Sequence, residues 1–149
     1  MAESTVTEKT PAPRLSEEEL RAGLAEAPAN PHLNYQLMKL LVEQGRTSEA
    51  LLPALKALES KKSGRKVYVD VLQLLTTMKL PRLVTVLGSE ALRNGIDHPR
   101  VYAAVARGQA ATKNLDGANA TLDSAQQTNA DSQILQRTRA RLEKRRQTK

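Results

Sequence analysis

Few residues in this 149-residue chain could carry out catalysis. Its two histidines, His32 and His98, each stand next to a proline and are expected to be ordinary surface residues. There is no cysteine to act as a nucleophile or a metal ligand, no glycine-rich phosphate loop and no HExxH spacing. Glu17, Glu18 and Glu19 are adjacent, but acids at a helix start are typical of side chains that complement the helix dipole. These patterns predict a protein that is not an enzyme and uses neither a metal nor a cofactor.

Positive charge is concentrated near the C-terminal end. The formal net charge is +7, yet residues 1–30 are net acidic and residues 132–149 carry seven bases and one acid. Such a cluster attracts polyanions in general, so a basic nucleic-acid-associated protein is one hypothesis. No aromatic residue is interleaved for base stacking, so sequence-specific reading is not expected. The candidate polyanion contacts are Arg137, Arg141, Lys144 and Arg145.

The composition predicts an aliphatic core and no membrane span. Apolar residues make up 40% of the chain, but there is no Trp or Phe and only three Tyr. No apolar run approaches the roughly 20 residues that a membrane helix requires. The first residues lack the apolar stretch of a secretory signal. We therefore expect a cytoplasmic protein.

A 34-residue period positions the helices of this chain. Small residues recur in two phases, and aliphatic residues recur in a third phase. The units that this period defines are 31–64, 65–98 and 99–132. The matching positions are Ala57, Ala91 and Ala125; Ala50, Val84 and Ala118; and Leu37, Val71 and Val105.

Each unit contains two segments with apolar residues three and four positions apart, the spacing of a helix face. The predicted helices are 31–44, 47–60, 65–78, 81–94, 99–112 and 115–128. Two end helices are expected at 16–27, where Ser16 and Glu19 have capping-box spacing, and at 131–147. Residues 1–14 are predicted to form a disordered tail, and Pro53 is expected to distort its helix locally.

The period resembles the tetratricopeptide repeat family, whose units are helix–turn–helix pairs of the same repeat length. The family's small residue at repeat position 20 is matched by Ala50, Val84 and Ala118, and its alanine at position 27 by Ala57, Ala91 and Ala125. The chain departs from the pattern in three ways: position 8 is small only at Ala106, the turn glycine, Gly45, is replaced by lysine in the later units, and the proline that often follows the second helix is absent at the expected phase. The resemblance covers roughly residues 31–132. It implies an all-α, right-handed solenoid of three units with two end helices.

The resemblance also implies a function. First helices in this family line a concave groove that holds a segment of another protein, so the chain is expected to be an adaptor, chaperone or assembly factor. Small chaperones of type III secretion translocators are a related alternative. Of the five positions of the clamp that holds EEVD tails, only Arg100 suits its role, so we predict no EEVD-tail binding. The implied groove residues are Tyr35, Gln36, Lys39, Lys66, Asp70, Gln73, Arg100, Ala104 and Arg107.

Overall fold

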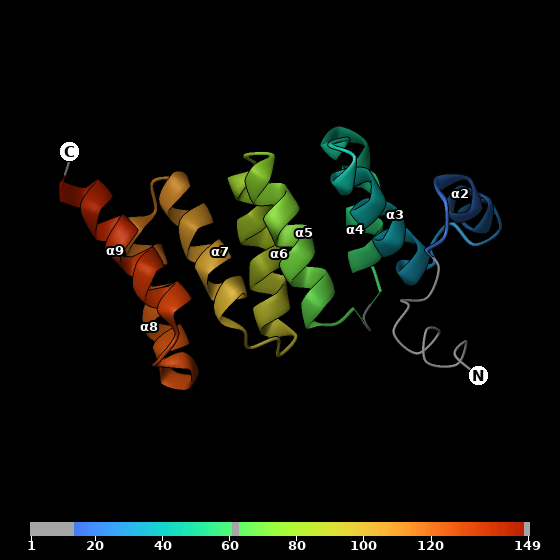
Figure 1. The fold of residues 1–149 in the computed structure, drawn as a ribbon. Helices are drawn as coiled ribbons and strands as arrows, with labels where there is room; N and C mark the ends of the chain where they lie inside the picture. Colours follow the sequence, from blue (N-terminus) through green and yellow to red (C-terminus); the bar gives the residue numbers. More distant parts are fainter. Residues whose placement is uncertain (1–13, 61–62, 148–149) are drawn as a thin grey trace, which may run out of the picture.

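A stack of helices forms the molecule. The computed structural model describes residues 14–60 and 63–147, and every regular element in these ranges is an α-helix. The helices follow one another in chain order, with α2 at one end and α9 at the other (Figure 1). Their bounds are α2 Glu17–Glu26, α3 Pro31–Glu43, α4 Thr47–Leu58, α5 Arg65–Thr77, α6 Pro81–Arg93, α7 Pro99–Ala111, α8 Leu115–Asn129 and α9 Gln133–Gln147.

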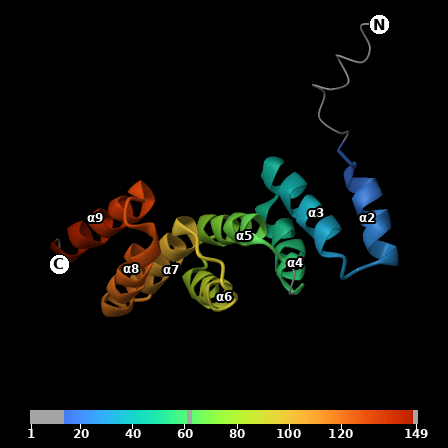
Figure 2. The same cartoon turned by 90° about the horizontal axis from the view of Figure 1, so that it is seen from below.

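Consecutive helices pack as antiparallel neighbours. When the stack is seen from below, α3 and α5 lie toward one side and α4 and α6 toward the other, and α9 lies beside α8 (Figure 2). Contacts also join α5 to α7 and α7 to α9, so alternate helices touch along the stack. This arrangement confirms the predicted all-α, repeat-like architecture. The predicted tail, 1–14, lies outside the described residues except for Arg14.

The helix starts follow the sequence signals. The Ser16 hydroxyl accepts a hydrogen bond from the backbone N–H of Glu19, and the Glu19 carboxylate accepts one from the backbone N–H of Ser16, which completes the predicted capping box. Asn30 caps α3 by accepting from the N–H of Leu33. Helix α4 continues without interruption across Pro53, and α9 starts at Gln133, slightly later than predicted.

The turns inside the three helix pairs have the same backbone geometry. Gly45, Lys79 and Lys113 occupy the same place in the three units that the sequence period predicts, and all have positive φ, at 75°, 59° and 66°. At each turn this residue donates to the carbonyl three residues back, and the next residue donates to the carbonyl five residues back. These paired bonds form a Schellman motif, which ends a helix with one left-handed residue. The turn conformation is therefore kept where the sequence replaces glycine.

Small residues allow the helices to approach closely. Ala57, Ala91 and Ala125 are completely buried, as the period predicts. Two glycines that the period does not mark have the same role where α6 crosses α7. A Cβ on Gly88 would lie 2.4 Å from Cγ2 of Val105, and a Cβ on Gly108 would lie 2.9 Å from the carbonyl oxygen of Pro81. A side chain at Gly88 would therefore clash with the Val105 side chain of α7, and one at Gly108 would clash with the backbone of α6.

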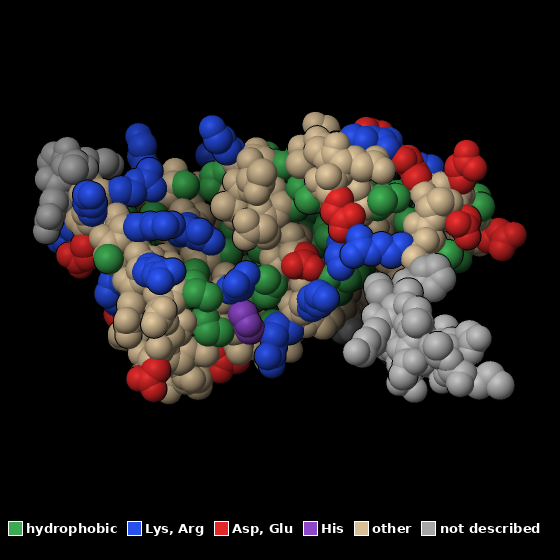
Figure 3. All heavy atoms as spheres, in the orientation of Figure 1, with side chains coloured by type: hydrophobic (Ala, Val, Ile, Leu, Met, Phe, Trp, Pro, Cys, Tyr) green, Lys and Arg blue, Asp and Glu red, His purple; other side chains and the backbone are tan. Residues whose placement is uncertain are grey.

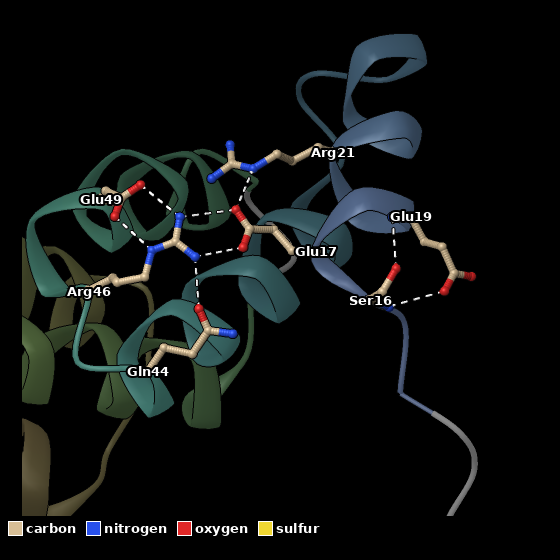
Figure 4. Close-up of polar contacts among 7 residues, drawn as sticks. All are labelled: Ser16, Glu17, Glu19, Arg21, Gln44, Arg46 and Glu49. Carbon is tan, nitrogen blue, oxygen red and sulfur yellow. Dashed lines mark hydrogen bonds and ion pairs between the residues drawn. The ribbon is translucent and has the colours of Figure 1, made fainter.

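An ion-pair network fastens α2 to the turn between α3 and α4 (Figure 4). The Arg46 guanidinium donates to both carboxylate oxygens of Glu17, at 2.6 and 3.1 Å, and also to Glu49. Glu17 accepts a further hydrogen bond from Arg21, one helical turn later. These donors, Arg46 first and then Arg21, lower the pKa of Glu17 to about 2. Glu17 therefore serves as a tertiary contact as well as a helix-start acid.

Within the described ranges, no helix has both the length and the apolar character needed to cross a membrane.

Candidate functional site

One face of the stack carries a row of polar side chains at a single repeat phase. Lys39, Gln73, Arg107 and Arg141 are separated by one full period each and come from α3, α5, α7 and α9. On the face shown in Figure 3, Lys and Arg side chains gather over α7 and α9, whereas Asp and Glu gather near α2. The charge asymmetry of the sequence is therefore also an asymmetry of the surface.

Four of the predicted groove residues come together in a pocket between α5, α7 and α9. Gln73 from α5 and Arg100, Ala104 and Arg107 from α7 line it, and Ile134 closes it from α9. Its volume is about 180 Å³. Ala104 is almost fully buried, so it forms the floor of this pocket instead of projecting from it.

A larger cleft of about 680 Å³ adjoins this pocket and shares Thr76, Ala104 and Arg107 with it. Its walls are mainly apolar. Helix α7 contributes only small side chains to the floor besides Arg107, which leaves the space open between the α5–α6 turn and α9. Its other lining residues are Lys79, Leu80, Pro81, Val84, Gly108, Ala111, Arg141, Leu142, Lys144 and Arg145.

Arg107 is the most unusual side chain in this region. Its Nε is buried and has no hydrogen-bond acceptor among the described residues. Burial lowers the pKa of Arg107, and the positive charge of Arg141 lowers it further. A half-buried guanidinium facing a second cation is an unfavourable arrangement that an anion would relieve.

The groove residues predicted in α3 lie apart from this pocket and mostly contact other residues of the chain. The Tyr35 hydroxyl donates to the Asp70 carboxylate, which links α3 to α5; burial and then this bond raise the pKa of Tyr35. The Lys39 ammonium lies 5.4 Å from the centre of the Tyr35 ring. Gln36 and His32 share a 2.7 Å hydrogen bond. Of the first-unit positions, Tyr35 therefore makes a contact between helices, whereas Gln36 and Lys39 line a separate pocket beside Glu43.

The remaining predicted contacts divide between the cleft and the open surface. Arg141, Lys144 and Arg145 line the cleft, whereas Arg137 is exposed on α9 outside it. Lys66 is exposed near the start of α5. The structure thus joins two sets that the sequence treated separately, because the C-terminal bases line the same cleft as Ala104 and Arg107 of α7.

A comparison of the chain with protein-family models finds no match, and a comparison with curated proteins finds none either. The geometry of the chain itself therefore carries the functional argument.

Two features of the site were missed from the sequence. Arg141 lies one full period after Arg107, so extending the period into the last helix would have placed both side chains on one face. Leu80, Pro81 and Val84 line the cleft through the start of α6, and periodicity alone assigns these residues to helix packing.

The histidine prediction needs a correction at one position. His98 was predicted to be an ordinary surface residue, but its Nδ1 accepts from the backbone N–H of Arg100 and caps α7. The side chain therefore has a structural role at the start of that helix.

Proposed function

We propose that the chain is a tetratricopeptide-repeat-like, right-handed solenoid of three units that binds a segment of another protein in the cytoplasm and catalyses no reaction. The recurrence of turn geometry at residues 45, 79 and 113 supports the repeat assignment. So does the burial of the alanines at 57, 91 and 125. Fold alone does not define a ligand, so the function rests on the surface of α5 and α7.

The observation that carries this proposal is the pocket formed by Gln73, Arg100, Ala104 and Arg107. These residues occupy positions that the family resemblance places in its groove, and they come from two helices to line one hollow. A volume of about 180 Å³ is large enough for a side chain but small for a whole ligand. A partner segment that inserts one side chain here and lies across α5 and α7 fits this geometry best.

Partner capture with charge-changing variants tests the proposal. We expect Arg100→Glu and Gln73→Glu to abolish capture of the protein that the wild-type chain retains from an extract, because both change the pocket mouth. Val86→Glu and Leu52→Glu are matched controls, since both residues are exposed on α6 and α4 and line none of these pockets. Capture that survives the pocket variants and is lost with the controls would place the binding site on the opposite face.

Polyanion binding through α9 is the second candidate function. Arg137, Lys144 and Arg146 are exposed on this helix, which bears six bases and one acid. This charge density favours phosphate contacts that do not depend on base sequence.

A further inference from the structure

The cleft of about 680 Å³ between α6, α7 and α9 has the dimensions of a small-molecule site. Ligand sites are commonly about 300–1,000 Å³ and have mainly apolar walls with a few polar groups. Here Leu80, Pro81 and Val84 form one wall and Leu142 of α9 contributes to the other. Gly108 and Ala111 have little or no side chain, so the cleft keeps room for an aliphatic chain.

Among the described residues, the charged side chains that line this cleft are all cationic. Arg107, Arg141, Lys144, Lys79 and Arg145 border it, and no described Asp or Glu does. The nearest acid on α9, Glu143, lines a different pocket. The buried Nε of Arg107 meets no acceptor within the described part of the chain. The cleft therefore offers an apolar wall together with a buried donor at Arg107 that the described fold leaves unsatisfied.

We propose that this cleft binds an amphiphilic anion, an aliphatic chain ending in a carboxylate, whose carboxylate is held by Arg107 and Arg141. The chain lies against Leu80, Val84 and Leu142. A guanidinium presents paired N–H donors that match the two oxygens of a carboxylate, and the aliphatic chain removes apolar surface from water. This site requires no partner protein, so its test is independent of the proposed function.

Calorimetric titration of the full chain with decanoate, below its micelle concentration, tests this site. Decanol is the uncharged control ligand, and acetate is the control ligand without a long aliphatic chain. We expect decanoate to bind and both control ligands to bind at least about tenfold more weakly, since each lacks one half of the interaction. Equal binding of decanoate and decanol, or no binding of decanoate, would overturn the assignment.

Three variants locate the site. Arg107→Gln should weaken decanoate binding by roughly tenfold or more and leave decanol unchanged, because only the charged contact is lost. Ala111→Phe, at an exposed position that lines the cleft, should weaken both by filling the space. Arg137→Gln removes an exposed α9 arginine outside the cleft and should change neither. Loss of decanoate binding with Arg137→Gln, or full binding with Arg107→Gln, would show that the carboxylate is held elsewhere.

Discussion

Lys79 and Lys113 occupy a backbone conformation that lysine rarely adopts. Left-handed geometry costs a residue with a Cβ about 1–2 kcal/mol. Glycine adopts this geometry freely, but its greater conformational freedom in the unfolded chain lowers the stability of the folded state by about 0.4–1 kcal/mol. The difference predicts that Lys79→Gly and Lys113→Gly each stabilise the protein by roughly 0.5–1 kcal/mol. Urea unfolding monitored by circular dichroism measures this change.

Matched substitutions separate this effect from the loss of a charge. Gly45→Ala, at the equivalent turn with φ of 75°, should destabilise the protein. Lys66→Gly, in the first turn of α5 where the backbone is helical, should destabilise it slightly. A lower unfolding free energy for Lys79→Gly would contradict the argument.

His98 links stability to pH. Burial lowers its pKa below the usual 6.5, and Arg65 and Arg100 lower it further against the opposing effect of Asp97. The cap requires an unprotonated Nδ1 to accept from the Arg100 N–H. As the pH falls, His98 therefore takes up its proton at a higher pH in the unfolded chain than in the folded chain. Stability should fall as pH drops below 6.5 toward the folded pKa.

His98→Asn tests this linkage. Asparagine caps α3 at the equivalent position, Asn30, so the variant should keep the cap and lose the stability slope that begins near pH 6.5. Urea midpoints measured on both sides of that pH would reveal the difference. An unchanged slope in the variant would assign the pH dependence to other groups.

At the scale of helices, the α6–α7 crossing is the contact most sensitive to volume. Gly→Ala inside a helix ordinarily stabilises by about 1 kcal/mol, but at Gly108 the new Cβ would meet the Pro81 carbonyl at 2.9 Å and Thr85 Oγ1 at 2.6 Å. Overpacking typically costs about 1–3 kcal/mol, so Gly108→Ala should be destabilising. Thermal unfolding checks this outcome.

Gly23→Ala in α2 is the control for that crossing. Its Cβ would approach only the Leu33 side chain, whose nearest atom, Cδ1, is the end of a flexible chain that can rotate away. We therefore expect this variant to be neutral or more stable. If Gly108→Ala behaved in the same way, the close approach of α6 and α7 would not be a constraint on the fold.

The attachment of α2 depends on the ionised Glu17 carboxylate. Because the folded pKa is about 2 and the reference value is 4.5, this contribution is present above pH 4.5 and is lost as pH falls toward 2. Glu17→Gln should reduce the loss of stability in that range and increase hydrogen exchange in α2 at neutral pH. Equal exchange in both proteins would mean that Leu20, buried against the first pair, is enough to hold the helix.

At the scale of the molecule, the period predicted the helices well and the site only in part. Helix positions follow from apolar spacing and caps such as Asn30, which are local signals. The hydrogen bond between Tyr35 and Asp70, and the effect of the Arg141 charge on Arg107, depend on how α3, α5, α7 and α9 are brought together. The cleft depends on small side chains of α7 facing α9, which a helix pattern does not distinguish from core packing.

Segregation of charge along the stack leads to a prediction for the whole molecule. Helix α2 carries four glutamates and one arginine, and α9 at the other end carries six bases and one acid. Duplex DNA should therefore bind weakly at low salt through the α9 end, without base preference. The logarithm of the binding constant should fall with the logarithm of salt concentration by roughly 0.9 for each phosphate contacted.

Charge neutralisation at different places discriminates the polyanion hypothesis from binding driven by net charge. Replacing Arg137, Lys144 and Arg146 with glutamine should reduce both the affinity and the salt slope, because these exposed bases lie on one helix. Replacing Lys39, Lys66 and Lys113 removes the same charge from separate places along the stack and should leave the slope largely intact. Gel shifts over a salt series give both quantities. Equal losses in the two variants, or no shift at low salt, would leave the pocket between α5, α7 and α9 as the stronger candidate for partner recognition.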